Sequence, residues 1–315
     1  MALALVLVAG CTGSTVLTVN GERISRGEFN REVERRLAII RKKNPGELEG
    51  SKGGKLKKET ERQVATETIK STLMEQQAKK LGVAPPAEEV ERRLEAERTR
   101  QGAARFEGQL AEQGLSEDEY RHRLADQALV EVLGNDVSAD MTATEDEAET
   151  FYLSNKGLFS RSPMIHVAHI LLDSEGQARI VEGELKKGAD FATLAKSLSR
   201  DYGSVKNGGD LGWVEKGTMD PDFESAAFAL GSGQVSGVVK ASDGYHVIKV
   251  LERREAYTPP FAEVKNDATT ALLNRKKEEK FQDWLRTVYA NAEVKVDAGL
   301  GRWDPRLGMV AGVRS

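Results

Sequence analysis

Three short stretches in the second half of the chain decide its fold: residues 167–172 read VAHILL, residues 208–213 read GGDLGW, and residues 244–250 read GYHVIKV. The first and third are apolar runs of strand length, and each carries one histidine, His169 or His246. The second is a glycine-rich turn that leads into a short strand. Together these stretches predict a small antiparallel sheet.

The segments between these strands have helical periodicity. Apolar residues recur every three or four positions in residues 175–187 and 190–199, and Pro221 opens a short helix. Ser162-Pro163 and Thr258-Pro259-Pro260 interrupt the pattern on either side. The sequence therefore predicts a compact α+β unit over residues 163–253, with helices flanking the sheet.

The chain before and after this unit is predicted to be helical. Asn20-Gly21 predicts a tight hairpin turn, residues 59–81 and 261–290 predict long helices, and Gly-, Lys- and Glu-rich residues 46–58 predict a mobile loop. Three capping boxes mark further helix starts, namely Ser25 with Glu28, Ser116 with Glu119, and Thr144 with Glu147. We expect residues 16–157 and 258–297 to form one helical domain and residues 298–315 to form a flexible tail.

The composition of the chain argues against several classes of protein. The 315 residues carry 46 Lys and Arg against 50 Asp and Glu, a net charge of −4, which argues against nucleic acid as a partner. A single cysteine excludes an internal disulfide framework and a multi-cysteine zinc finger. No apolar run approaches the ~20 residues that cross a bilayer, so a multi-pass membrane protein is excluded.

The N-terminus has the character of a secretion signal. Residues 1–10 read MALALVLVAG, and the only cysteine, Cys11, follows directly. Residues 8–11 resemble a bacterial lipobox, in which small residues precede a cysteine that is lipidated. The resemblance implies a signal peptide over residues 1–11, lipidation of Cys11, and an extracytoplasmic, membrane-anchored lipoprotein on the periplasmic or cell-envelope face. No Lys or Arg precedes the apolar run.

Few side chains suit catalysis by bond cleavage or by a metal. His122 lies in a charged helical segment and is expected at the surface, whereas His166 and His169 are three apart on a strand and point to opposite faces. His169 and His246, embedded in core strands, form either a structural pair or a site; with Asp201 they could formally make a two-histidine, one-carboxylate iron site. No serine lies in a Gly-x-Ser-x-Gly elbow, and the glycines do not fit a phosphate-binding loop.

The order of these motifs resembles the parvulin-type peptidyl-prolyl cis-trans isomerases. The match runs unbroken over residues 163–253 through VAHILL, Gly188-Ala-Asp-Phe191, Asp201, GGDLGW and GYHVIKV. Residues 19–25 and the closing helix with Phe281 and Trp284 resemble the SurA and PrsA group of extracytoplasmic foldases. In that group an N-terminal helical chaperone domain is completed by a C-terminal helix, and a parvulin domain is inserted between them.

The resemblance implies a set of site residues. The two histidines of the family's site fall on His169 and His246, and its Cys or Asp position falls on Asp201. The apolar pocket for proline falls on Leu211, Met219, Phe223 and Phe228. The position that is often Thr before Gly-Tyr-His lies in Ala241-Ser242-Asp243, so a supporting hydroxyl is either absent or supplied by Ser242.

These residues suit prolyl isomerisation, which breaks no bond and needs neither metal nor cofactor. The barrier of about 18–20 kcal/mol comes from twisting the amide out of conjugation, so an enzyme need only bind the twisted form best. The predicted function is isomerase and chaperone for unfolded or partly folded exported polypeptides with X–Pro bonds. The alternative is a holdase without catalysis, in which the parvulin domain only docks peptides.

Overall fold

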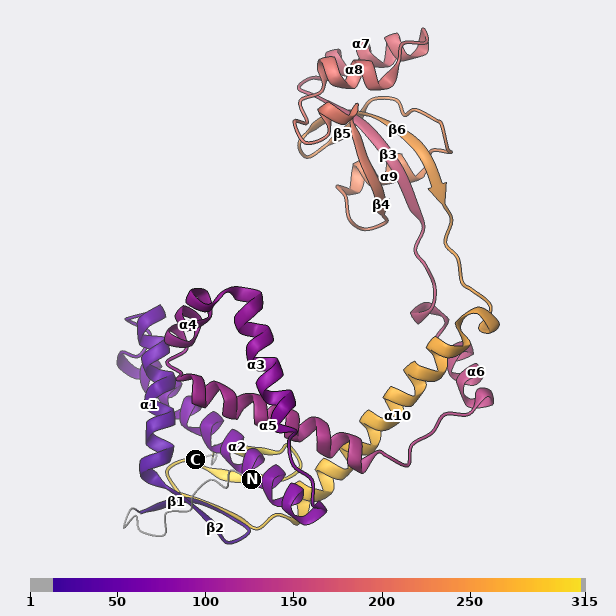
Figure 1. Cartoon of the computed structure of the whole chain (residues 1–315). Coiled ribbons are helices and arrows are strands. Elements are labelled where there is room, and N and C mark those ends of the chain that lie inside the picture. The colour runs from indigo at the N-terminus through magenta and orange to yellow at the C-terminus, as the bar shows by residue number, and fades with distance from the viewer. Residues whose placement is uncertain (1–13, 313–315) are drawn as a thin grey trace. The chain divides into compact units, whose positions relative to one another are not determined.

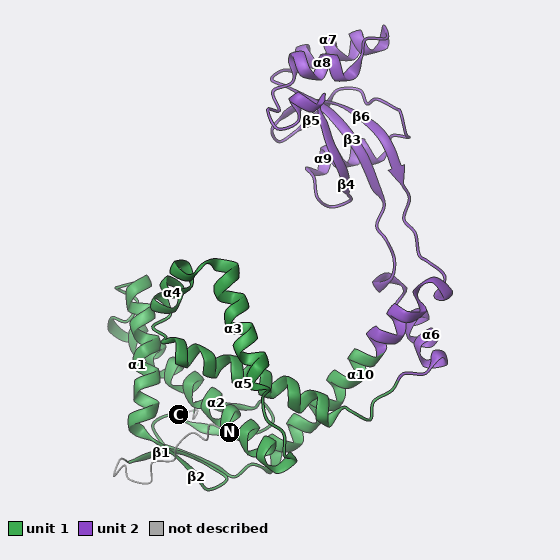
Figure 2. Ribbon diagram, viewed as in Figure 1, with its two compact units in different colours: residues 1–142, 273–315 green, residues 143–272 purple. Residues whose placement is uncertain are grey.

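The computed structural model describes residues 14–312, and the chain divides into two compact units (Figures 1 and 2). Unit 1 comprises residues 1–142 and 273–315, and unit 2 comprises residues 143–272. Unit 2 is therefore an insertion in the sequence of unit 1. The second boundary falls inside helix α10, Phe261–Asn291.

Unit 1 is mainly helical. Its helices before the insertion are α1 (Arg26–Lys43), α2 (Gly50–Leu81), α3 (Ala87–Gln101), α4 (Ala103–Glu112) and α5 (Glu117–Val137). The capping boxes predicted at Ser25 and Ser116 are both present, and Gly82 ends α2 in the left-handed conformation with φ of 70°. Local sequence signals thus set the helix boundaries.

A three-stranded antiparallel sheet joins the two ends of the chain. Its order is β2 (Glu22–Ser25), β1 (Thr15–Val19) and β7 (Val294–Val296). Asn20 and Gly21 both have positive φ, 49° and 87°, as the predicted hairpin turn requires. The Asn20 side chain accepts a hydrogen bond from the backbone N–H of Glu293 at 2.8 Å, so the N-terminal turn fixes the segment that follows α10.

The mobile loop predicted over residues 46–58 is wrong, because α2 begins at Gly50. The positions buried in this part of the helix are Gly53 and Thr60, with Leu56 half-buried. A Cβ on Gly53 would lie 2.0 Å from the carbonyl carbon of Leu48, so only glycine allows this close approach. Periodicity of apolar residues missed the helix because its buried face here is made of small and polar residues.

The flexible tail predicted over residues 298–315 is also wrong for the part that the structure describes. Strands β8 (Arg302–Asp304) and β9 (Met309–Ala311) form a hairpin. Trp303 is 7% exposed and lies edge-to-face with Tyr289 of α10, and the backbone N–H of Val310 donates to Thr66 Oγ1 of α2 at 2.9 Å. Docking onto these helices orders the hairpin, and such contacts have no local sequence signal.

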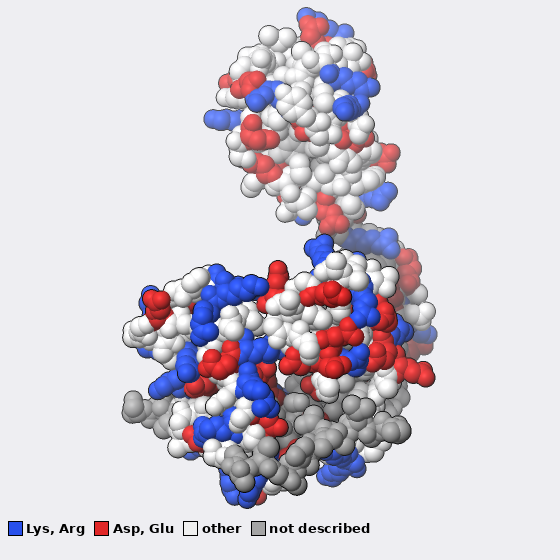
Figure 3. Space-filling view, turned by 60° about the vertical axis from the view of Figure 1, so that its left-hand side comes forward, with Lys and Arg blue, Asp and Glu red and all other residues white. Residues whose placement is uncertain are grey.

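The surface of unit 1 carries charges of both signs in alternation. Figure 3 shows Lys and Arg interleaved with Asp and Glu over its visible face. Ion pairs link α3 to α5, as between Arg93 and Glu131 at 2.6 Å and between Glu91 and Arg121 at 2.8 Å. These pairs between helices occur beside pairs within α3, such as Arg92 with Glu89 at 2.6 Å.

Unit 2 contains the predicted small antiparallel sheet. Its strand order is β4 (Asp210–Glu215), β3 (Met164–Leu172), β6 (Gly244–Arg254) and β5 (Val239–Ala241). Helix α9 (Pro221–Phe228) covers one face, and α7 (Glu175–Lys186) with α8 (Phe191–Leu198) covers the other. Each face has its own apolar cluster, and β3 contributes to both: Ile165 and Val167 face α9, and Ala168 and Ile170 face α8.

Helix α6 (Glu145–Ser154) belongs to unit 2, although the sequence placed residues 145–157 with the helical domain. Its Thr144 capping box is present as predicted. The Tyr152 hydroxyl donates to the Pro259 carbonyl at 2.6 Å, and Glu145 pairs with Lys265 of α10 at 2.6 Å. These contacts fasten α6 to the first turns of α10 within the same unit.

Cys11 and the apolar segment before it lie outside the described residues. Within residues 14–312, none of the helices has both the length and the apolar character needed to cross a membrane.

Candidate active site

The centre of the candidate site is a pair of buried histidines on neighbouring strands of unit 2. His169 lies on β3 opposite Ile248, and His246 lies on β6 opposite Leu171. They are 6% and 2% exposed, and their Nδ1 atoms lie 3.1 Å apart. Sequence reasoning left open whether these two residues are structural or part of a site. The structure places them in direct contact.

Asp201 is brought to this pair by the segment that follows α8. The Ser199 hydroxyl oxygen accepts from the backbone N–H of Leu171 at 3.2 Å and of Asp201 at 3.3 Å, which anchors the segment to β3. Asp201 Oδ2 then lies 2.8 Å from His169 Nε2. The three residues proposed from sequence as the catalytic set are therefore contiguous.

Hydrogen-bond donors keep Asp201 ionised. The hydroxyl of Ser204, a residue only 3% exposed, donates to Oδ2, and the backbone N–H of Gly203 donates to Oδ1 at 3.0 Å. The Ser204 hydrogen bond is the largest influence on the Asp201 pKa, which is lowered to about 2, and His169 and Gly203 lower it further. Sequence reasoning missed Ser204 because serine near a glycine-rich turn is common.

The environment of His169 acts in two directions. Burial lowers the pKa of His169 and the neighbouring His246 lowers it further, whereas the hydrogen bond to Asp201 raises it; the net direction is downward. The atoms of His169, His246 and Asp201 that could bind a metal do not converge on one point, because each ring nitrogen already has its own hydrogen-bond partner. This geometry disfavours the two-histidine, one-carboxylate iron site that the residue types alone allowed.

The glycine-rich turn is required for the backbone to reach His169. Gly209 accepts a hydrogen bond from the His169 backbone N–H at 2.9 Å, and its φ is 82°. A Cβ on Gly209 would lie 2.1 Å from the His169 carbonyl oxygen. Only glycine fits here, so this turn holds β3 in place under the histidine.

An apolar wall adjoins the polar network. Leu211, Met219, Phe223 and Phe228 all belong to the apolar cluster on the α9 side of the sheet. Phe223 is 2% exposed, and its ring lies edge-to-face against both histidines, with centroids 5.8 Å from His169 and 5.3 Å from His246. The other three are partly exposed. Phe223 thus touches both histidines, and Leu211, Met219 and Phe228 pack against the cluster to which it belongs.

The turn before His246 differs from both alternatives considered from sequence. The Ser242 backbone N–H donates to Asp220 Oδ2 at 3.3 Å, and hydrogen bonding to Ser242 is the main cause that lowers the Asp220 pKa. His246 Nε2 instead lies 2.8 Å from Asp243 Oδ1. A carboxylate therefore occupies the place where a supporting hydroxyl was expected, and sequence reasoning missed its role.

The remaining histidines lie elsewhere. His166 faces away from His169, with its Nε2 2.8 Å from Asp210 Oδ1 and its ring 5.5 Å from Trp213. His122 is exposed on α5, as predicted. The strand periodicity that argued against joint metal binding by His166 and His169 is confirmed, since the two share no partner.

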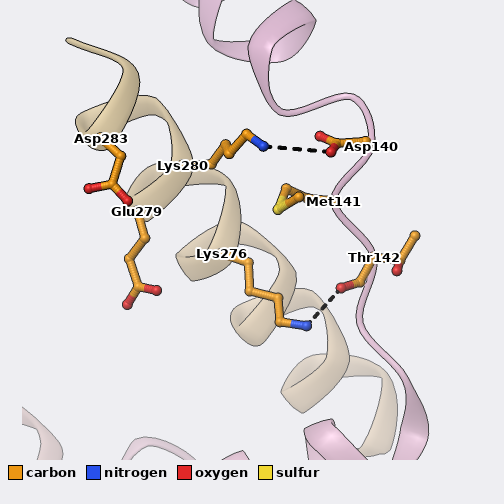
Figure 4. A pocket seen from close by; sticks show the side chains of 7 residues that line it. All are labelled: Asp140, Met141, Thr142, Lys276, Glu279, Lys280 and Asp283. Atoms are coloured by element: carbon orange, nitrogen blue, oxygen red, sulfur yellow. Dashed lines mark hydrogen bonds and ion pairs between the residues drawn. The ribbon is translucent and has the colours of Figure 1, made fainter. Parts of the chain in front are cut away.

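A hollow of about 360 Å³ in unit 1 shares no residue with this site. It lies between α10 and residues 140–142 and is lined largely by charged side chains (Figure 4). Lys276 Nζ donates to the Thr142 carbonyl at 3.0 Å, and Lys280 pairs with Asp140 at 3.6 Å. These bonds fasten the chain after α5 to α10, which accounts for the polar lining.

Comparison with known proteins identifies related chains. Residues 172–252 match the PPIC-type PPIase domain, and residues 2–133 match the SurA-like N-terminal domain. The chain is 31% identical to foldase protein PrsA of Clostridium botulinum over 289 residues, covering 87% of this chain and 86% of the relative. It is 32% identical to foldase protein PrsA of Clostridium kluyveri over 294 residues, with the same coverage.

Solved structures of similar proteins include PrsA from Bacillus anthracis, 27% identical, covering 70% of this chain and 95% of that one with a TM-score of 0.34. A SurA-like chaperone structure from Campylobacter jejuni is 25% identical, covering 90% of this chain and all of that one with a TM-score of 0.46. From the relatives' identity and coverage, the chain belongs to the PrsA family of extracytoplasmic foldases, chaperones that carry a parvulin-type peptidyl-prolyl isomerase domain.

Proposed function

We propose that His169, Asp201 and His246, together with the apolar wall of Leu211, Met219, Phe223 and Phe228, form the surface on which X–Pro bonds isomerise. The observation that carries this proposal is the direct contact of the two parts, since Phe223 lies against both histidine rings. The pyrrolidine ring is apolar and suits the wall, while the amide carbonyl is polar and suits the edge formed by the network. A substrate spanning both would be held on either side of the bond that rotates.

Rate acceleration on such a surface needs only preferential binding of the twisted amide. The planar amide is polarised by resonance, and twisting removes that polarisation. A poorly solvated site therefore favours the twisted form, and each tenfold gain in rate needs about 1.4 kcal/mol of preference. The ionised Asp201 and its partners would act by electrostatics and orientation, because no proton has to move.

The helical unit 1, residues 1–142 and 273–315, is proposed to hold unfolded or partly folded exported polypeptides while residues 163–253 act on their X–Pro bonds. The discontinuous sequence of unit 1 supports this arrangement, because the isomerase segment is inserted between its two parts.

The membrane is a further proposed partner, reached through a lipid on Cys11. The motif at residues 8–11 supports this, and a mature protein whose mass lacks an acyl increment on Cys11 would contradict it.

One observation favours a second function, a holdase without catalysis. His169, His246 and Phe223 are 6%, 2% and 2% exposed, so a bound peptide reaches little of their surface without rearrangement. In this case the site would be a scaffold that shapes a peptide-docking face. The two functions differ in what the site residues contribute.

Refolding of a client whose slow phase is limited by prolyl isomerisation separates the two functions. With the chain from Thr12 onward, we expect the slow phase to accelerate, and Asp201→Asn and Met219→Ala to reduce the acceleration at least tenfold while aggregation suppression persists. Met309→Ala on β9 of unit 1 is the matched control and should act like the unaltered chain. Unaltered acceleration in both site variants would refute the assignment, and no acceleration by the unaltered chain would favour the holdase.

A further inference from the structure

The candidate site contains a four-membered chain of hydrogen bonds in which both ends are carboxylates. Asp201 Oδ2 lies 2.8 Å from His169 Nε2, the two Nδ1 atoms lie 3.1 Å apart, and His246 Nε2 lies 2.8 Å from Asp243 Oδ1. The imidazole rings are inclined by 23° with centroids 5.3 Å apart. Given the short Nδ1–Nδ1 distance, the rings meet edge to edge and not face to face, so the two Nδ1 atoms point at each other.

The number of protons follows from this geometry. An ionised carboxylate accepts hydrogen bonds and donates none, so both Nε2 atoms must carry hydrogen. The contact between the Nδ1 atoms needs one further hydrogen, because two bare nitrogen lone pairs repel at 3.1 Å. All three contacts are satisfied when the four ring nitrogens carry three hydrogens, one more than two neutral imidazoles have. In that state the pair shares one positive charge.

A neutral pair cannot satisfy all three contacts. With hydrogen on both Nε2 atoms, the Nδ1 lone pairs face each other. With hydrogen on one Nδ1, the Nε2 of the same ring is bare and faces a carboxylate. Either arrangement places like partial charges together within a buried site, where the repulsion is weakly screened. The observed distances therefore favour the three-hydrogen state.

Two carboxylates offset the cost of burying this charge. Asp201 is part of the site proposed above, whereas Asp243 comes from the turn between β5 and β6, and its side chain is 58% exposed. Among the described residues, the charges that act on His169 are those of His246, Asp201 and Asp243. Helix α9 contributes the ring of Phe223 and, at its start, Asp220, which is hydrogen-bonded to Ser242 beside Asp243. Burial opposes the charge on His169, so the proton is held only while both ends of the chain are anionic.

We propose that Asp243 is a positioning residue of the isomerase site: it orients the His246 ring and retains a third N–H hydrogen in the His169–His246 pair. The inference rests on the proposed function for its link to catalysis, but the proton count stands on geometry alone. The third hydrogen belongs to the pair and not to either ring, because it lies between the two Nδ1 atoms. Removing the charge of Asp243 should make the third proton easier to lose.

The test is a pH titration of the full chain, labelled with nitrogen-15 in its histidines and followed by NMR of the ring nitrogens. In the unaltered chain we expect three hydrogens on the four nitrogens of the pair at pH 6, with the third lost at higher pH. In Asp243→Asn the midpoint should fall by about one pH unit, a tenfold loss of proton affinity. Asp243→Glu, which retains the charge, should restore most of the midpoint.

Asp222→Asn is the matched control, because Asp222 is an exposed carboxylate of α9 in the same unit and is not among the charges acting on His169. It should leave the midpoint unchanged. A neutral pair with two hydrogens at pH 6 in the unaltered chain, or equal shifts in Asp243→Asn and Asp222→Asn, would overturn the proposal.

The pH profile of kcat/KM for an X–Pro peptide links the proton to function. Its midpoint should move with the NMR midpoint in Asp243→Asn. If the NMR midpoint moves but the chain accelerates no peptide, the proposed function fails and the proton inference stands. If the chain is active and its profile does not follow the NMR midpoint, the positioning role of Asp243 is refuted.

Discussion

Removal of the Ser204 hydroxyl tests how the network fixes Asp201. In Ser204→Ala, the carboxylate loses one of its three donors inside a region where Ser204 itself is 3% exposed. A hydrogen bond to a charged group contributes about 1.5–3 kcal/mol, so we expect unit 2 to lose about 2 kcal/mol of unfolding free energy at pH 7. The remaining donors, His169 and Gly203, keep Asp201 ionised.

The loss of stability in Ser204→Ala should depend on pH through the pKa of Asp201. The Asp201 pKa in the folded chain, about 2, lies below the value in an unfolded chain, so its ionised form stabilises the fold above about pH 4. That contribution is lost as the pH falls through 2. Ser204→Ala raises the folded pKa toward the unfolded one, so the difference between the two proteins should shrink between pH 4 and pH 2.

Amide hydrogen exchange of the β3–β6 ladder measures this free energy within unit 2 alone. Ser197→Ala is the matched control, because the Ser197 hydroxyl is exposed on α8 and donates only to the Thr193 carbonyl within the helix. It should change stability by less than about 0.5 kcal/mol. A similarly small effect of Ser204→Ala at pH 7, or a difference that does not shrink below pH 4, would show that the Ser204 hydroxyl does not stabilise the ionised Asp201.

Three further predictions concern the glycine-rich turn, the apolar wall and the C-terminal hairpin. Gly209→Ala should prevent unit 2 from folding, because the added Cβ would lie 2.1 Å from the His169 carbonyl oxygen. Gly217→Ala, where φ is 94° but the surrounding space is open, should lower the free energy of unfolding by only about 1–2 kcal/mol. Circular dichroism and hydrogen exchange of the β3 amides distinguish the two variants. Met219→Ala should lower kcat/KM for an X–Pro peptide at least tenfold while the melting temperature changes little, and an unchanged kcat/KM would remove Met219 from the site. Deleting residues 298–315 should expose α2 amides near Thr66 to faster hydrogen exchange, since Trp303 and Val310 are 7% and 0% exposed; unchanged protection would show that the hairpin adds no stability.

Sequence reasoning succeeded where the signal is local. The Asn20-Gly21 turn, the capping boxes at Ser25, Ser116 and Thr144, and the strand histidines all follow from short-range stereochemistry. It failed where order comes from distant contacts. The start of α2 is buried through Gly53 and Thr60, and the C-terminal hairpin is held by Trp303 against Tyr289. Neither segment has a periodic pattern of apolar residues.

The candidate site likewise combines residues that the sequence identified with residues that it missed. The family resemblance pointed to His169, Asp201, His246 and the apolar wall. The structure places the three polar residues in contact with one another and Phe223 of the wall against both histidines. Ser204 and Asp243 were missed because their roles depend on how two loops close on the histidines. A carboxylate in a turn is usually solvated, so composition and spacing give no reason to single out Asp243.

Exchange spectroscopy on a short X–Pro peptide tests whether this surface isomerises X–Pro bonds. We predict that the chain from Thr12 onward, in catalytic amount, speeds cis–trans exchange from tens of seconds into the range of a second or less, about a tenfold gain or more. Asp201→Asn should remove most of that gain while the β3–β6 ladder stays protected from hydrogen exchange. No acceleration by the folded, unaltered chain would show that this surface does not isomerise X–Pro bonds.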